Sequence, residues 1–93
     1  DFSVMSGTYN MAVTRDVAHW ESYILSCLSS CWRYSNRGMV FNLLASDNSY
    51  ISEGMLYHSN LFNIRRYCRA NFGPTRIIRE PRLPSDATLV VSR

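Results

Sequence analysis

Polar side chains that can bind a small molecule follow the first apolar segment of the chain. Phe2–Met5 has the composition of a buried strand. The residues after it with hydroxyl or amide groups are Ser6, Thr8, Tyr9 and Asn10. Because ligands of open α/β sheets bind beyond the carboxyl ends of strands, these groups can orient a bound molecule there. The alternative is that Ser6 and Asn10 hydrogen-bond backbone groups within a turn, as these residue types commonly do.

A second pair of polar side chains, Tyr57 and His58, follows residues 46–54. That segment is rich in Asp, Asn, Ser and Gly, which is the composition of a loop. We predict that Tyr57 and His58 line the same pocket as the first polar loop. A histidine close to the start of a helix is also commonly a surface or capping residue, so that alternative stays open.

The cysteines favour a reducing compartment and do not by themselves indicate a metal site. Cys27, Cys31 and Cys68 are odd in number and too sparse for a disulfide framework, so we expect a cytoplasmic protein. Cys27 and Cys31 are one helical turn apart and can share a face. The two histidines, His19 and His58, lack the close ligand spacing of a zinc site, and we therefore expect no metal ligands.

Size, composition and charge exclude several broad classes. The chain has 93 residues, 46% of them hydrophobic, which suits one small domain spanning residues 1–93. Its ten basic residues are all arginine, but they are scattered and accompany no base-stacking motif, so we do not expect a nucleic-acid partner. No stretch approaches the roughly 20 apolar residues of a membrane span, and we do not expect a membrane partner.

The first half of the chain predicts a strand, a long helix and a second strand. Thr14 can cap a helix with Asp16 in its first turn, where a carboxylate suits the positive end of the helix dipole. Apolar residues recur every three or four positions over residues 17–32, which predicts an amphipathic helix on a sheet. Residues 36–38 can end it, and the nearly continuous apolar run 39–45 predicts a strand covered on both faces.

The second half predicts a shorter helix and a hairpin. Ser59 or Asn60 can cap a helix whose apolar stripe is Leu61, Ile64 and Cys68. Residues 75–80 and 87–92 are strand candidates, and the prolines within residues 81–86 should keep this connection out of the ladder. The expected class is α/β, with a mixed sheet that combines parallel crossovers and an antiparallel terminal hairpin.

This order of elements and four short sequence words resemble the carboxyl-terminal half of class I S-adenosylmethionine-dependent methyltransferases, across essentially the whole chain. The words are FSVMSGTYN at 2–10, HWESYI at 19–24, GMVFN at 38–42 and LYHSN at 56–60. The resemblance implies half of a Rossmann-like sheet. Residues 2–10 would be the fourth strand and its substrate loop, residues 38–44 the fifth strand, and the last strand would insert between the fifth and sixth.

The resemblance also implies the acceptor side of a methyltransferase site. The residues that would bind the methyl acceptor are Ser6, Thr8, Tyr9, Asn10, Tyr57 and His58. Family members hold S-adenosylmethionine with a glycine-rich turn and an acidic residue from the first two strands, and this sequence has neither; its four glycines are too scattered. We therefore expect a methyltransferase-like fragment that does not catalyse methyl transfer on its own.

The first strand predicts a partner. Without the first three strands of such a sheet, Phe2–Met5 would be an edge strand with unpaired backbone groups, which is a template for another chain. We expect a homodimer through this edge, or pairing with an amino-terminal half of the fold. The alternative function is a small dimeric α/β module that binds an unknown ligand. No motif places a Ser-His-Asp or Cys-His set together for a different enzymatic reaction.

Overall fold

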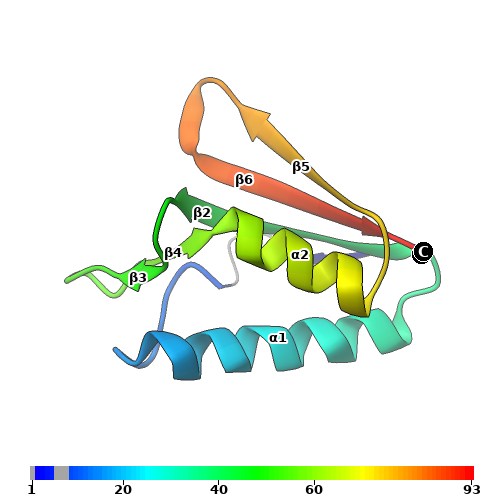
Figure 1. The fold of residues 1–93 in the computed structure, drawn as a ribbon, viewed down its shortest axis with the longest axis horizontal. Helices are drawn as coiled ribbons and strands as arrows, with labels where there is room; N and C mark the ends of the chain where they lie inside the picture. The colour runs from blue at the N-terminus through cyan, green and yellow to red at the C-terminus, as the bar shows by residue number, and fades with distance from the viewer. Residues whose placement is uncertain (1, 6–8) are drawn as a thin grey trace.

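The computed structural model describes residues 2–5 and 9–93, with the side chain of Pro84 excepted. Its strands are β1 (Phe2–Met5), β2 (Gly38–Ser46), β3 (Tyr50–Ile51), β4 (Tyr57–Asn60), β5 (Thr75–Glu80) and β6 (Leu83–Ser92). Its helices are α1 (Val17–Tyr34) and α2 (Leu61–Asn71). The strands form one mixed sheet, and Figure 1 shows both helices on the same side of it.

Strand β2 lies at the centre of the sheet. On one edge its first residues pair in parallel with β1, and its last residues pair in parallel with β4. On the other edge it pairs antiparallel with β6, which in turn pairs antiparallel with β5. The short β3 pairs antiparallel with β4. The last strand of the chain therefore lies between β2 and β5.

The side chains of β2 alternate between a covered and an uncovered face. Met39, Phe41 and Leu43 are fully buried in the core with residues of both helices, whereas Val40 and Leu44 are half-buried on the opposite face. The crossovers through α1 and α2 step in the same direction across the sheet, from β1 to β2 and from β4 past β2 and β6 to β5. Crossovers of one common hand then place both helices on one face.

Helix α1 begins after Asp16 and not after the predicted cap, Thr14. The Asp16 carboxylate accepts a hydrogen bond from the backbone N–H of His19 at 3.1 Å, whereas the Thr14 hydroxyl accepts one from the N–H of Asp16. Asp16 is the residue with extended backbone angles directly before the helix, which brings its carboxylate to the free N–H groups of the first turn. The predicted apolar stripe is confirmed by its buried members, Trp20, Ile24 and Leu28.

Arg93 fastens the end of α1 to the end of β6. Its Nε donates a hydrogen bond to the carbonyl oxygen of Ser35 at 2.7 Å, and a terminal amino group donates to the carbonyl oxygen of Trp32. The guanidinium carbon also lies 4.2 Å from the centre of the Trp32 ring. A cation is favourable here because the last carbonyl groups of a helix are unpaired and lie at the negative end of its dipole.

Helix α2 begins at the cap that the sequence predicts. The Oδ1 atom of Asn60 accepts a hydrogen bond from the N–H of Asn63 at 3.2 Å, and its Nδ2 donates to the carbonyl oxygen of Asp47 at 2.8 Å. Asn60 therefore caps α2 and also holds the loop that follows β2. Ile64 and Cys68 are buried, which confirms the predicted stripe.

The structure adds two short strands that the sequence analysis did not predict. Residues 46–54, expected to be a loop, contain β3, and β4 lies directly before α2. The segment doubles back between them: the N–H of Met55 donates to the carbonyl oxygen of Ser52, and the N–H of Ser52 donates to that of Leu56, both at 2.9 Å. Strands of two and four residues are too short to show a hydrophobic period.

The hairpin of β5 and β6 is tighter than predicted. The sequence analysis assigned residues 81–86 to the connection, but only residues 81–82 lie between the two strands. The pairing register shifts near the end of β5, which leaves residues 84–86 without a partner on that strand. An irregularity of this kind accommodates Pro84, because proline has no N–H to donate to a ladder.

One face of the sheet and the outer edge of β1 carry no covering element among the described residues. On this face, Asn42 Nδ2 donates to Thr88 Oγ1 across β2 and β6 at 2.9 Å. Strand β1 pairs only with β2, so that its other edge is open, and Phe2 and Val4 are exposed. The sheet is therefore a layer with helices on one side only.

The predicted fold class is confirmed in its coarse form. The chain forms a small α/β domain with a mixed, open six-stranded sheet and two helices. The expected parallel pairing of Phe2–Met5 with the second main strand and the antiparallel terminal hairpin are both present. Neither α1 nor α2, the helices within the described part of the chain, is long and apolar enough to cross a membrane.

Substitution of Gly38 tests the close approach of β2 and β6. Gly38 has a φ of 145°, and a Cβ there would collide with the carbonyl oxygen of Val91. We expect Gly38→Ala to lower the free energy of unfolding by about 2 kcal/mol or more, because both the backbone angle and the backbone contact exclude a side chain. Gly54→Ala is the matched control, since its Cβ would meet only Ser52 Oγ at 4.0 Å. If urea unfolding showed the same loss of unfolding free energy for Gly38→Ala and Gly54→Ala, this account would be contradicted.

Candidate functional site

The loop after β1 runs along the start of β4. The N–H of Tyr57 donates to the carbonyl oxygen of Asn10 at 2.8 Å, and the N–H of Ala12 donates to that of Met55 at 2.8 Å. Between them, an antiparallel bridge joins Met11 and Leu56. The structure thus brings together two predicted site regions, residues 9–10 and Tyr57, which a helix and two strands separate in the sequence.

Tyr57 acts as a buried hydrogen-bond donor in this site. Its side chain is 0% exposed, and its hydroxyl donates to Oε2 of Glu21 on α1 at 2.5 Å. Burial, and then the hydrogen bond to Glu21, raise the pKa of Tyr57 above its usual value. The phenol therefore stays protonated and holds the half-buried Glu21 carboxylate in place, where a ligand can reach the carboxylate but not the tyrosine ring.

Tyr9 also belongs to the core. Its carbonyl oxygen accepts a hydrogen bond from Nε1 of Trp20 at 3.3 Å, and its hydroxyl lies 3.3 Å from Met5 Sδ. Burial, with contributions from Cys27 and Cys31, raises the pKa of Tyr9. The side chain is 4% exposed, so its role in this conformation is to position the loop.

Asn10 is a predicted site residue with an unused polar atom. Its side chain is half-buried, and its Oδ1 atom is buried without a hydrogen-bond partner among the described residues. A buried acceptor that lacks a partner is unfavourable by about 1–3 kcal/mol, and most such atoms bind water or a ligand. Asn10 is therefore suited to accept a hydrogen bond from a bound molecule.

His58 lies on the other face of the sheet. Successive side chains of a strand point to opposite faces, so His58 points away from Tyr57 and Glu21. Its ring stacks on Tyr50 of β3, with ring centres 4.4 Å apart and planes inclined by 2°. The sheet therefore separates His58 from Asn10, and the remaining predicted residues, Ser6 and Thr8, lie outside the described residues.

Glu21 is a site residue that the sequence analysis missed. The sequence feature that could have identified it is its position directly after Trp20, at the edge of the buried stripe of α1. Nothing in the sequence indicates that Tyr57 reaches it, because that contact depends on β4, whose residues YHSN lack the apolar composition that predicted β1.

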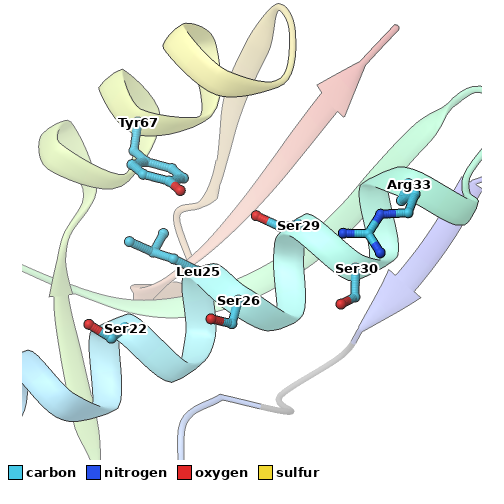
Figure 2. A pocket seen from close by; sticks show the side chains of 7 residues that line it. All are labelled: Ser22, Leu25, Ser26, Ser29, Ser30, Arg33 and Tyr67. Atoms are coloured by element: carbon cyan, nitrogen blue, oxygen red, sulfur yellow. The ribbon is translucent and has the colours of Figure 1, made fainter.

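A polar hollow of about 510 Å³ lies between the two helices, away from these residues. Figure 2 shows Tyr67 of α2 across from α1, and Arg33 toward the end of α1. The other lining side chains, all on α1, are Ser22, Leu25, Ser26, Ser29 and Ser30. This hollow contains none of the predicted site residues, and its serine lining is that of a solvated groove between helices.

Two further hollows flank the sheet. One of about 420 Å³ lies where β2 ends and α2 begins, beside Asp47 and Asn60. The other, of about 400 Å³, lies between β1 and α1, and its lining includes Met5, Tyr9, Tyr23, Cys27 and Cys31. Tyr9 thus connects the predicted loop with the hollow beside β1.

Comparison of the chain with protein-family models, with curated proteins and with solved structures returned no match. The chemistry of the site is therefore interpreted from its geometry. Beyond the carboxyl end of β1, Asn10 offers an acceptor and Glu21 a carboxylate, and both contact Tyr57. Each of these two groups accepts hydrogen bonds, so the chemistry of either one suits a molecule that donates them.

Substitution of Tyr57 by phenylalanine tests the buried hydrogen bond and its pH dependence. At about pH 7 we expect Tyr57→Phe to lower the free energy of unfolding by about 1–2 kcal/mol, because it removes the donor to Glu21. The pKa of Tyr57 is higher in the folded than in the unfolded protein, so its stabilisation is complete below about pH 10 and is lost as the pH rises further.

The difference between wild type and Tyr57→Phe should therefore shrink in urea unfolding at about pH 11. Tyr34→Phe is the matched control, because Tyr34 is 80% exposed, and it should leave stability unchanged at both pH values. A difference that stays constant between the two pH values would show that the pKa of Tyr57 is not raised.

Proposed function

We propose that this chain is the carboxyl-terminal half of a class I S-adenosylmethionine-dependent methyltransferase fold and carries the acceptor side of its site. The observation that carries the proposal is the strand arrangement. Parallel β1 and β2 are neighbours, and the last strand lies antiparallel between β2 and β5. The resemblance implies the same arrangement for the fourth, fifth, sixth and last strands of such a sheet. Strands β3 and β4 are additions that it does not imply.

The open edge of β1 supports the proposal. In a complete sheet of this kind the first three strands would continue the sheet beyond the fourth, which corresponds to β1. Here that edge has no partner among the described strands, and it carries the exposed Phe2 and Val4. An amino-terminal half that pairs with β1 would cover both the backbone groups and these apolar side chains.

Acceptor binding is assigned to the groups beyond the carboxyl end of β1. Asn10 provides a buried oxygen without a partner, and Glu21 provides a carboxylate that Tyr57 orients. A methyl-accepting substrate whose amine or hydroxyl group donates hydrogen bonds suits both of these groups. His58 is not included, because it lies on the other face of the sheet.

The proposal assigns no cradle for S-adenosylmethionine to the described residues. If Gly38 or Gly73 were replaced by alanine, the new Cβ would collide with a carbonyl oxygen of β6. These two glycines therefore allow close packing within the domain. Gly54 lies in the turn before β4. No described glycine remains for a turn that approaches the cofactor. The proposed role is therefore limited to the acceptor side, with the cofactor held mainly by the other half of the fold.

Nuclear magnetic resonance titration of the isotopically labelled chain with ethanolamine, a small molecule that carries both the amine and the hydroxyl group proposed for the methyl acceptor, tests this proposal. We expect weak, saturable shift changes with a dissociation constant of about 1 mM or higher, centred on the amides of Tyr9, Asn10 and Tyr57, because only one side of the pocket is present. Asn10→Ala should abolish them. Asn36→Ala, at an exposed residue before β2, is the control and should retain them. No change at about 10 mM ligand, or changes confined to another surface, would overturn the proposal.

A dimeric binding module is the second candidate function. The observation that favours it is the same open edge of β1, where Val4 is 70% exposed within a strand. Two copies could pair through this edge and form one continuous sheet with a twofold axis.

Analytical ultracentrifugation of a lysine variant tests the dimer. We expect the wild-type chain to dimerise, and Val4→Lys to weaken the dimer at least about tenfold, because a charge on an edge strand opposes strand pairing. Val13→Lys is the matched control, since Val13 is 84% exposed but lies in the loop before α1. A wild-type chain that remains monomeric at about 1 mM would exclude this function.

A further inference from the structure

Three sulfur-containing side chains line one hollow where β1 ends beside α1. The Sγ atom of Cys31 lies 3.4 Å from the Sδ atom of Met5. Cys27 precedes Cys31 by one helical turn, so the two thiols lie on the same side of α1. All three residues line the same hollow of about 400 Å³.

This sulfur cluster, defined as Met5, Cys27 and Cys31, can be reached from solvent. Each of its three residues is half-buried, and the hollow that they line is open to the surface. The third cysteine, Cys68, is fully buried elsewhere in the core. An ion or reagent from solution can therefore reach the cluster but not Cys68.

The donors of the sulfur cluster are all soft. Thiolate and thioether sulfur favour Cu(I) and similar ions, whereas Mg²⁺ and Ca²⁺ require oxygen ligands. A structural zinc site takes four ligands, and no three His, Cys, Asp or Glu side chains come together in the described part of the chain. Two sulfur atoms that bind one ion at about 2.3 Å are at most about 4.6 Å apart. The Met5 and Cys31 sulfur atoms satisfy this limit.

The surroundings of the cluster are uncharged. Apart from its sulfur atoms, the described lining consists of the hydroxyl-bearing side chains Tyr9, Tyr23, Ser26 and Ser30. A cation binds to these thiols by displacing their protons, because the thiolate is the form that binds a metal ion.

We propose that Met5, Cys27 and Cys31 form a three-coordinate site for a thiophilic monovalent cation of the Cu(I) class. Three S–Cu bonds form, two S–H bonds break, and the two protons pass to solvent without a change of oxidation state. The loaded site carries a net charge of −1, which hydrogen bonds from the nearby tyrosine and serine hydroxyls can stabilise. The site does not depend on the proposed methyltransferase role.

This inference departs from the expectation of no metal ligands. That expectation rested on the spacing of cysteine and histidine along the sequence. The third donor is a methionine on a strand, and only the packing of β1 against α1 brings its sulfur to Cys31. The donor set could not be assembled from sequence spacing.

Anaerobic titration of the reduced protein with Cu(I), in competition with a chromophoric Cu(I) chelator, tests the site. We expect one ion per chain, with three sulfur neighbours in X-ray absorption spectra. Cys27→Ser and Cys31→Ser should each weaken binding at least about a hundredfold, because each removes one thiolate ligand. Met5→Leu should weaken binding about tenfold and leave two sulfur neighbours.

Two variants outside the cluster serve as controls, with circular dichroism to confirm folding. Met11→Leu replaces an exposed methionine, and Cys68→Ala removes the buried thiol; both should bind one ion with wild-type affinity. The proposal is overturned if the wild-type chain does not bind one ion in competition with the chelator. It is equally overturned if Met5→Leu keeps three sulfur neighbours, or if any folded variant of the cluster binds as tightly as the wild type.

Discussion

The pairing of β2 with β6 is the constraint on which the rest of the fold depends. The two strands run antiparallel from Gly38 opposite Ser92 to Leu44 opposite Asp86. This pairing places β5 at one side of the sheet and leaves the other edge of β2 for β1 and β4. It also brings Arg93 to the last carbonyl groups of α1. The close approach at Gly38 is possible only because that residue has no side chain.

The one-sided placement of the helices determines which surfaces remain available. Both helices bury the face of Met39, Phe41 and Leu43, so the face of Val40 and Leu44 keeps its apolar side chains without a second layer. The open edge of β1 adjoins this face. An open edge is normally protected by short length, charge or a partner, and within the described part of the chain β1 has only the first of these. This combination is why both candidate functions include a partner at β1.

Met5 connects the two chemical features of the molecule. It ends β1, and its sulfur contacts the Tyr9 hydroxyl on one side and the Cys31 thiol on the other. Tyr9 leads into Asn10, whose carbonyl oxygen binds the N–H of Tyr57, and Tyr57 in turn holds Glu21. A ligand at the acceptor groups and an ion at the sulfur cluster would therefore contact the same short segment of chain, although neither site requires the other.

The sequence by itself determined the elements whose signals are local. The apolar period of residues 17–32, the helix cap at Ser59 or Asn60 and the strand composition of Phe2–Met5 each depend on neighbouring residues. The structure has this helix and this strand, and it places the cap at Asn60. Tertiary structure alone decided the contacts between distant segments: Tyr57 with Glu21, Met5 with Cys31, and the separation of His58 from Asn10 by the sheet. The first and third of these depend on β4, whose polar residues give no strand signal, and the second depends on the packing of β1 against α1. Packing, rather than local propensity, sets which distant strands and helices meet and in which register.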